Sequence, residues 1–528
     1  MAPLMRVVGI PGAGKTTLLK RQVEAWHERD GIEPERMVLT SFTRAAANIL
    51  RGRIPVPTQN ASTLHSFAFR GLNRPPIAEA DKALVEQWNS QPIPLEWKVG
   101  GKKTAVEESV YTDLLTETPA LQEYTLYRSD PSRFRAYGLK WAKFIAAWED
   151  FKQQTGSIDF QDMIDLALTD LDVCPGDPDC FVVDEAQDLN PTQWALVHKW
   201  GNEAYHRFVV AGDPAQCLFS FVGARPDELL EPLPAEQHHL LGHSWRNPPA
   251  VMEVANYWLS KHSGTMMQGR ISEPNNAEGK VYRLPGVMWT EPEGLVANVL
   301  QDSAEGKTSM ILAGCGYTLK DTLTALREFG VPFHNPYRPA EGKWNPLVRR
   351  EDTTTSAQRI RLFMEGRGQT GARATTWLEK LPAALFQGTR KAALELVGAM
   401  SRVESLEPIL HPAGAAAWAA GDGEWYVKAF PERDRKPLAY AWQIYRRDPK
   451  LLDAPPSAII GTVHSVKGGE ADRVYLFPDM PKHVIDDAHE YQSERDAIIR
   501  MVYVAISRAR ENVIFCEAER ASQSWEDL

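Results

Sequence analysis

The stretch FVVDEAQDLNPTQ, residues 181–193, carries the strongest signal for the fold. Its apolar run, 181–183, ends abruptly in two adjacent carboxylates, Asp184 and Glu185. Such a run is typical of a buried parallel strand, and an α/β sheet binds its ligands at the carboxyl ends of its strands. Two acids at that position can divide the chemistry, since one can hold a magnesium ion while the other orients and deprotonates a water. Such a division of roles between Asp184 and Glu185 is useful only if a nucleotide lies opposite the two carboxylates.

A phosphate-binding loop is predicted near the start of the sequence. Residues 9–16, GIPGAGKT, fit G-x-x-x-x-G-K-[ST], follow the apolar Val7-Val8 and precede a helix-like run at 17–26. Glycines let the backbone N–H groups face the phosphates, while Lys15 would reach the β and γ phosphates and the Thr16 hydroxyl would bind magnesium. A chance match of a glycine-rich turn is the alternative. The predicted nucleotide contacts are Gly9, Pro11, Gly12, Ala13, Gly14, Lys15, Thr16 and Thr17, and with the acidic pair they predict a nucleoside triphosphatase.

The composition bounds the class of protein. A chain of 528 residues is expected to form about three or four domains. Its 43% hydrophobic and 24% charged content is that of an ordinary soluble globular protein. The net charge of −10 argues mildly against a protein coated by nucleic acid, but a local basic groove is enough for binding.

Cysteine usage and the terminal sequence predict a cytoplasmic protein. The five cysteines are scattered without a CxxC pair, so we expect reduced structural thiols and no zinc site. The first residues run straight into the phosphate loop, which leaves no room for a signal peptide. No apolar run approaches membrane-spanning length, so no membrane contact is expected.

Further segments combine strand-like runs with polar or aromatic residues. They are 38–44 (VLTSFTR), 61–67 (ASTLHSF), 208–216 (FVVAGDPAQ), 219–224 (FSFVGA), 241–247 (LGHSWRN), 459–470 (IIGTVHSVKGGE) and 501–510 (MVYVAISRAR). The hydroxyls, aromatics and histidine of the first two suit phosphate contacts and base stacking on single-stranded nucleic acid. Alone, each of these two segments is more often an ordinary strand end.

The order and content of these segments resemble the superfamily 1A DNA helicases of the UvrD/Rep/PcrA type. DEAQD fits that family's DExQD box, and AGDPAQCLFSFVGA looks like its GDxxQSIYxFRGA segment. SWRN is similar to its NYRS segment, TVHSVKGGE to TxHxxKGLE, and YVAISRAR to YVAxTRA. The matches run in family order from Gly9 to Arg510. The resemblance implies an α/β fold of two RecA-like P-loop NTPase domains, each with an inserted, mainly helical subdomain.

The resemblance also implies cofactors, ATP and Mg²⁺, and the role of each matching residue. Glu185 would activate water, Gln216 would sense the γ-phosphate, and Trp245, in place of the family's tyrosine, would stack on adenine. Glu470 would contact the ribose. The implied catalytic residues are Lys15, Glu185, Gln216, Arg246 and Arg508, the two arginines reaching the γ-phosphate from the second motor domain, and the implied metal ligands are Thr16 and Asp184.

A nucleic-acid path and several departures follow from the same comparison. The implied contacts are Phe42, Phe219 and Phe221, which match base-stacking aromatics, with Thr63, His65 and His464 nearby. The family usually has a glutamine upstream of the phosphate loop that reads adenine, but none precedes Gly9, so strictness for ATP stays open. Val222 stands where the family usually has arginine, which removes one coupling ion pair. Gly469 and Ala471 replace a leucine and a phenylalanine.

The gaps between the motifs predict the domain plan. Residues 1–70 and 156–235 would form the first motor domain, 236–340 and 441–528 the second, and 71–155 and 341–440 the two inserted domains. The tryptophans and tyrosines of 71–155 are expected to fill a small helical core rather than contact nucleic acid.

The predicted function is an ATP-dependent DNA helicase or translocase that moves 3′ to 5′, a polarity that rests on the resemblance alone. Its partners would be single-stranded DNA, its junctions with duplex, and a protein that loads it; a monomer is favoured. Three alternatives remain: an ATPase that remodels protein–nucleic acid complexes without unwinding, an RNA motor, and a metabolic P-loop kinase. The kinase does not explain the segments around Arg246, Glu470 and Arg508.

Overall fold

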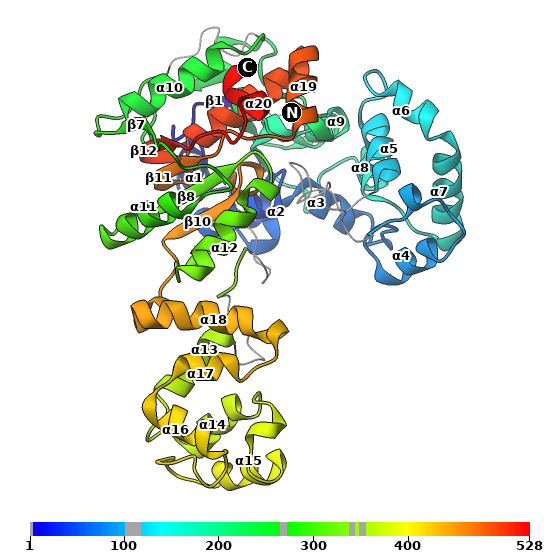
Figure 1. The fold of residues 1–528 in the computed structure, drawn as a ribbon. Coiled ribbons are helices and arrows are strands. Elements are labelled where there is room, and N and C mark those ends of the chain that lie inside the picture. The colour runs from blue at the N-terminus through cyan, green and yellow to red at the C-terminus, as the bar shows by residue number, and fades with distance from the viewer. Residues whose placement is uncertain (1–3, 101–117, 265–271, 337–343, 348–354) are drawn as a thin grey trace.

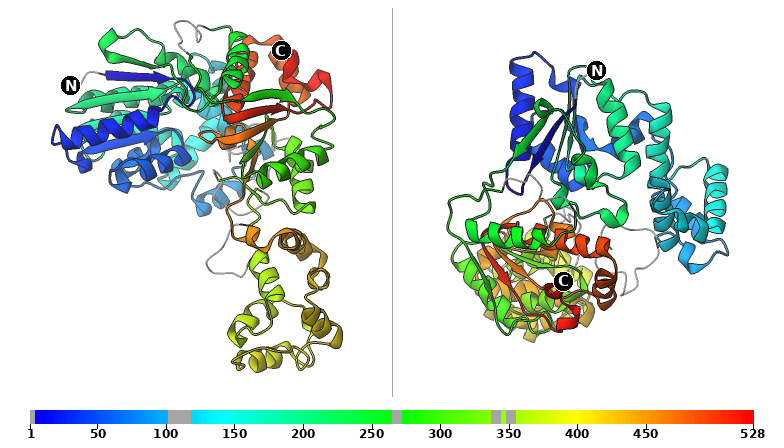
Figure 2. Two further views of the ribbon diagram at one scale, coloured as in Figure 1. Left: turned by 90° about the vertical axis from the view of Figure 1, so that its left-hand side faces the viewer. Right: turned by 90° about the horizontal axis from the view of Figure 1, so that it is seen from above.

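The computed structural model describes residues 4–100, 118–264, 272–336, 344–347 and 355–528. In these residues the strands form two parallel sheets with helices packed against them (Figure 1). Figure 2 shows the two sheets side by side, the N-terminal one with blue to green strands and the C-terminal one with green, orange and red strands. The mixed α/β class predicted from the sequence is confirmed.

The first sheet has the strand order β3–β2–β4–β5–β1–β6. Its strands are β1 (Leu4–Gly9), β2 (Met37–Ser41), β3 (Ala61–Thr63), β4 (Cys180–Asp184), β5 (Arg207–Gly212) and β6 (His238–Leu241). Every pairing is parallel, with Val182 of β4 opposite Leu39 of β2 and Val209 of β5. The carboxyl ends of the strands therefore meet at one edge, which brings the loop after β1 close to the acids at the end of β4.

Helices cover both faces of this sheet. They are α1 (Lys15–Glu28), α2 (Arg44–Arg53), α3 (Leu64–Gly71), α8 (Phe160–Asp170) and α9 (Pro191–Glu203). Trp26 of α1 packs in one core with Val182, whereas Trp200 of α9 packs in another with Phe181 and Val183. Because successive strand side chains point to opposite faces, a strand covered on both faces needs the unbroken apolar run seen in the sequence.

Strand β6 corrects the predicted boundary at residue 235. It pairs in parallel with β1, with His239 opposite Val7, so residues 238–241 complete the first sheet. The prediction was wrong because this short edge strand, His-His-Leu-Leu, has no continuous apolar run. The first α/β unit therefore extends to Leu241.

The second sheet has the order β7–β12–β11–β8–β10–β9, again all parallel. Its strands are β7 (Lys280–Arg283), β8 (Ser309–Ala313), β9 (Phe333–His334), β10 (Ala458–Thr462), β11 (Ala471–Leu476) and β12 (Ala509–Phe515). The helices packed with it are α10 (Pro249–Ser260), α11 (Glu293–Ala304), α12 (Lys320–Glu328), α19 (Lys482–Glu490) and α20 (Gln492–Ile506). Residues 498–506 of α20 are buried throughout, so this helix is held firmly in the molecule.

Two groups of helices stand away from the sheets in Figure 1. One contains α4 (Lys82–Asn89), α5 (Pro119–Ser129), α6 (Arg135–Lys140) and α7 (Ala142–Thr155), whose core holds Trp88, Phe144 and Trp148. The other contains α13 (Ser356–Met364), α14 (Gly371–Leu378), α15 (Arg390–Gly398), α16 (Pro412–Ala420), α17 (Gly423–Lys428) and α18 (Glu432–Arg447). The predicted boundary at residue 440 is wrong, because it falls inside α18.

All five cysteines are buried free thiols. Among the helices described by the structure, none combines the length and apolarity needed to cross a membrane.

Candidate functional site

The loop after β1 has the backbone of a phosphate cradle. Gly12 and Gly14 have φ angles of 70° and 83°, in the left-handed region that glycine adopts without strain. A Cβ atom on Gly12 would lie 2.5 Å from Cβ of Arg246, so only glycine fits there. Gly14 is the N-cap of α1, and the helix begins with Lys15, whose Nζ donates to the Gly9 carbonyl at 2.8 Å. The predicted nucleotide loop therefore directs the amino end of α1 into the site.

The acidic pair meets this loop. The Thr16 hydroxyl donates to Oδ2 of Asp184 at 3.2 Å, and Asp184 is only 5% exposed. Burial and the neighbouring Glu185 raise the pKa of Asp184 to about 6. A hydroxyl and a carboxylate are oxygen ligands of the kind that Mg²⁺ prefers, so Thr16 and Asp184 together fit the predicted metal site.

Glu185 has a strained backbone. Its φ of 56° places a non-glycine residue in the left-handed region, a conformation that accumulates at functional sites. The Gln187 side chain donates to the Glu185 carboxylate and accepts from the Asp213 N–H at 3.1 Å. Burial would raise the pKa of Glu185, but Lys467 and Lys15 outweigh it and lower that pKa, so the carboxylate is ionised. An oriented, charged carboxylate is suited to act as a general base.

The two arginines reach the site from different places. Arg508 immediately precedes β12 of the second sheet; its Nη2 donates to Oε1 of Gln216 at 2.7 Å, and Gln216 in turn donates to Asp213 at 2.8 Å. Arg246 lies on the connection between β6 and α10, and its Nε donates to Glu470 at 2.7 Å. The structure thus places all four predicted residues in bonded pairs at the site.

These groups line one cavity of about 880 Å³. Its walls contain residues 12–17 of the phosphate loop, the acidic pair, Gln216, Trp245, Arg246, Glu470 and Arg508. Gly9 and Pro11 support the loop rather than line the cavity, since Pro11 accepts from the Ser244 hydroxyl at 2.8 Å. The Trp245 indole is 74% exposed, and its backbone N–H donates to the Gly12 carbonyl at 2.9 Å, so its ring is free to stack on a base.

Lys467 also lines the cavity, although no role was predicted for it from the sequence. Its ammonium pairs with Asp188, donates to the Gln216 carbonyl at 3.0 Å, and lies 3.7 Å from Glu185. Burial would lower the pKa of Lys467, but Asp188 and Glu185 outweigh it and raise that pKa, so the side chain is a permanent cation here. Its position in the segment TVHSVKGGE could have drawn attention to it. Its partners belong to the first α/β part, so the pairing could not be predicted from the local sequence.

Four of the predicted nucleic-acid residues form one aromatic cluster. The Phe219 ring lies 5.2 Å from Phe42, 6.1 Å from Phe221 and 6.2 Å from His464, measured between centroids. Phe219 is 2% exposed and forms the base of the cluster, whereas the other three are partly exposed. Only the exposed members can stack on a base in this conformation.

The two remaining candidates have other surroundings. The Thr63 hydroxyl caps α3 by accepting from the Ser66 N–H at 3.3 Å. The His65 ring makes an edge contact with Phe160 at 6.2 Å, and burial lowers the pKa of His65 to about 4. Thr63 therefore serves the start of a helix, and His65 is a neutral ring packed against α8.

A second cavity, of about 640 Å³, opens on the other side of Phe221 and His464. Helix α6 and the turn before it contribute Arg133, Phe134 and Tyr137 to its lining. The Phe134 and Tyr137 rings are stacked at 5.4 Å, and the Arg133 guanidinium lies 5.1 Å from the Phe134 centroid. The expectation that the aromatics of 71–155 fill a core fits Trp88 but missed this pair.

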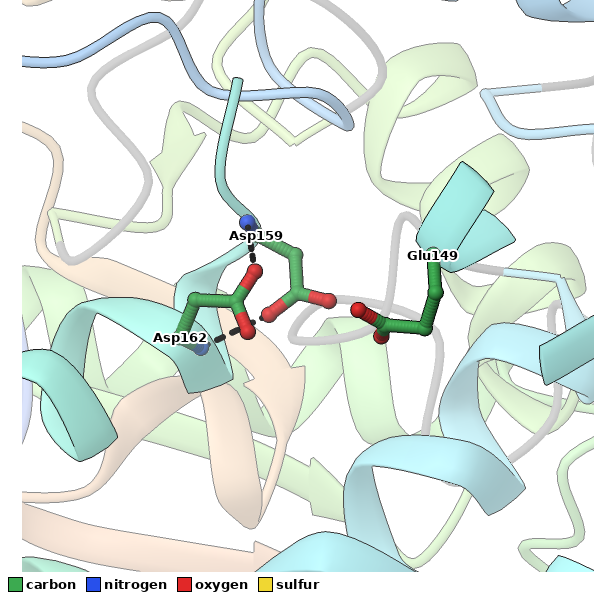
Figure 3. A group of neighbouring side chains, drawn as sticks. All are labelled: Glu149, Asp159 and Asp162. Carbon is green, nitrogen blue, oxygen red and sulfur yellow. Dashed lines mark hydrogen bonds between the residues drawn. The ribbon is translucent and has the colours of Figure 1, made fainter. Parts of the chain in front are cut away.

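Three carboxylates near α8, Glu149, Asp159 and Asp162, are close enough to suggest a metal site (Figure 3). The Lys152 ammonium lies 2.8, 2.7 and 2.5 Å from their respective oxygens. Lysine therefore already supplies the positive charge at the centre of this cluster, which is a structural tie between α7 and α8.

Comparison with known proteins agrees with this geometry. Residues 4–234 match the UvrD/REP helicase N-terminal domain. A Mycoplasma capricolum protein named "Probable DNA helicase II homolog" is 22% identical over 308 residues, 52% of this chain and 41% of that protein. The ATP-dependent DNA helicase PcrA of Leuconostoc citreum is 21% identical over 323 residues, 57% of this chain and 42% of PcrA.

A shorter match is closer in sequence. The ATP-dependent DNA helicase UvrD2 of Mycobacterium tuberculosis is 32% identical over 95 residues, 17% of this chain and 13% of that protein. In each of these three matches the chain covers less than half the length of the relative. The ordered motifs, the cavity they build and these matches make the chain similar to DNA helicases of the UvrD/Rep/PcrA type, with the family match lying in residues 4–234.

Proposed function

We propose that this protein is an ATP-dependent motor that moves 3′ to 5′ along single-stranded DNA and separates duplex at the junction. The observation that carries the proposal is the 880 Å³ cavity, whose phosphate loop and acids come from the first sheet, whose Lys467 and Arg508 come from the second, and whose Arg246 lies on the connection between them. A site divided in this way changes shape when the two parts move. The relatives' names, DNA helicase and ATP-dependent DNA helicase, support DNA as the track.

Hydrolysis would proceed at the carboxyl edge of the first sheet. Lys15 and the loop N–H groups would bind the β and γ phosphates, and Thr16 with Asp184 would hold a magnesium ion that supplies positive charge to these phosphates. Glu185, fixed by Gln187, would orient the attacking water and accept its proton. The strained backbone of Glu185 would keep the carboxylate aimed at the cavity.

Closure of the cavity would complete the charge stabilisation. Arg246 and Arg508 stabilise negative charge on the γ-phosphate only when the second part approaches the first, which ties hydrolysis to movement. Arg508 already contacts Gln216, the proposed phosphate sensor. Trp245 would stack on the base and Glu470 would bind the ribose.

Single-stranded DNA would pass over the aromatic cluster. Phe42, Phe221 and His464 offer faces for stacking, and the second cavity continues from Phe221 towards Phe134. Stacking on aromatics does not depend on base identity, which suits a motor that must pass every sequence. Thr63 and His65 would act behind this surface by shaping α3.

The remaining parts of the proposal concern organisation. Each sheet with its helices would be a RecA-like motor domain, and the α4–α7 and α13–α18 groups would be the inserted subdomains. The protein would work in the cytoplasm as a monomer, brought to DNA by a loading partner.

The test is ATP hydrolysis by the full chain with and without a single-stranded oligodeoxynucleotide. Glu185→Gln should abolish hydrolysis, while Glu203→Gln, the same change at the exposed end of α9, should not alter it. Stimulation by DNA in the wild type and strand separation on a 3′-tailed duplex are the expected results. Stimulation by RNA alone would identify an RNA motor, and stimulation without strand separation would indicate a remodelling ATPase. Hydrolysis unaffected by either nucleic acid would refute the proposal.

A further inference from the structure

Arg500 of α20 makes a set of contacts that none of the proposed roles uses. The residue is 6% exposed, and its guanidinium reaches the segment 217–220 that follows β5 in the first sheet. Nε donates to the Cys217 carbonyl at 3.0 Å, and Nη2 donates to the Ser220 hydroxyl at 3.1 Å. Nη1 lies 2.8 Å from Nε2 of His262, just after α10. The buried guanidinium of Arg500, on the second α/β part, therefore donates hydrogen bonds to two residues of one loop of the first α/β part.

The segment 217–220 connects the nucleotide cavity to the aromatic cluster. At its start, the Gln216 side chain accepts from Arg508 and the Gln216 carbonyl accepts from Lys467. At its end, Phe219 and Phe221 belong to the aromatic cluster. The contacts of Arg500 lie between these ends, and its Ser220 partner separates the two phenylalanines in the sequence. Whatever moves Ser220 therefore moves the aromatic rings on either side of it.

Helix α20 is placed to transmit this movement from the nucleotide cavity to the segment 217–220. Arg500 lies within the helix and Arg508 lies two residues beyond its last residue, Ile506, and both contact the same segment. A helix rises about 1.5 Å per residue and transmits displacement along its axis without bending. Because the bonds from Arg500 are charge-assisted and buried, the segment follows the helix more readily than it slips against it.

We propose that Arg500 is a positioning residue that transmits closure of the nucleotide cavity to the aromatic cluster, and so makes ATP hydrolysis responsive to single-stranded nucleic acid. The proposal rests on the proposed function. Arg500 itself touches no part of the phosphate cradle or the acidic pair. Its loss should therefore reduce the response to DNA while leaving the unstimulated reaction in place.

The experiment compares unstimulated and oligodeoxythymidylate-stimulated ATP hydrolysis in Arg500→Gln, Arg500→Lys and Ser220→Ala. Arg495→Gln is the matched control, since Arg495 lies on the same helix and also donates to a carbonyl, that of Leu528. We expect Arg500→Gln to keep unstimulated turnover and the KM for ATP within about two-fold, and to lose about ten-fold or more of the DNA-stimulated kcat. Arg500→Lys should recover part of this loss, and Arg495→Gln should behave as the wild type.

Ser220→Ala gives the second readout, because it leaves Arg500 in place with its Cys217 and His262 contacts. It should reduce stimulation on its own, and it should add nothing to Arg500→Gln if the arginine acts through this hydroxyl. Should Arg500→Gln fail to fold, Ser220→Ala decides alone. Stimulation equal to that of the wild type in a folded Arg500→Gln variant, or in Ser220→Ala, would overturn the inference while leaving the proposed function intact. A wild-type protein that no nucleic acid stimulates would overturn both.

Discussion

Replacing Gly12 by alanine should open the nucleotide cavity without unfolding the protein. The new Cβ would lie 2.5 Å from Cβ of Arg246 and 2.8 Å from the Ser244 hydroxyl, so the segment 244–246 must move away. This movement breaks the bonds from Ser244 to Pro11 and from the Trp245 N–H to Gly12, which contribute about 0.5–1.5 kcal/mol each. The φ of 70° adds about 1–2 kcal/mol of strain for a residue with a side chain.

These terms sum to about 2–5 kcal/mol against the observed loop, or a roughly 30- to 5,000-fold weaker affinity for ATP. Titration with a fluorescent ATP analogue measures this affinity directly. Gly31→Ala is the matched control, since Gly31 has a φ of 68° and no described atom within 4 Å of the added Cβ. Gly31→Ala should lower the melting temperature because of the backbone strain, and should leave the affinity for ATP unchanged. Equal affinities in the two variants would refute the reasoning, because they would mean that the contact with Arg246 does not matter.

Two further results are expected. Phe221→Ala should weaken binding of a single-stranded oligonucleotide by roughly 1–3 kcal/mol in an anisotropy titration, with Phe221→Tyr as the control that keeps a stacking ring. Acid should weaken the contact of α7 with α8. Burial alone would raise the pKa of Asp162, but the charges of Lys152 and Arg128 outweigh burial and lower that pKa below 3.8. The stabilisation is therefore present above pH 3.8 and is lost as the pH falls below it. Protection factors of the α7 amides, which correct for the intrinsic pH dependence of exchange, that stay constant between about pH 6 and pH 2 would contradict this.

The buried strands and the nucleotide loop could be read from the sequence because their signals are local. Strand β5 occupies Arg207–Gly212, overlapping the strand-like segment predicted at 208–216, and β4 ends at Asp184 as its run predicted. Such strands are covered on both faces and must be apolar throughout. Strand β6 was missed because an edge strand is under no such requirement. The domain boundary at residue 440 was misplaced because α18 continues through Pro437 to Arg447, whereas proline usually signals a break in a helix.

The candidate site could be predicted only as a set of residues, because its geometry depends on the approach of the two sheets. Lys467 and Asp188 are 279 positions apart, and no local pattern shows that they pair. Thr63 shows a different ambiguity, since the hydroxyl that the sequence predicts to contact nucleic acid also caps a helix. The two roles have the same local signature, a hydroxyl at the end of a strand.

The pairing of charges in the cavity explains how closure could be reversible. Arg246 bonds to Glu470, Arg508 to Gln216, and Lys467 to Asp188, so the cations of the cavity are held by protein groups. Without these partners the buried cations would have no compensation for the water they lose, which costs free energy. A triphosphate carries more negative charge than these partners and competes for the same donors, so its binding would exchange bonds within the cavity rather than create a new charge imbalance. The difference between two nearly balanced sets of bonds is small, and a motor that opens and closes once per ATP needs a small difference.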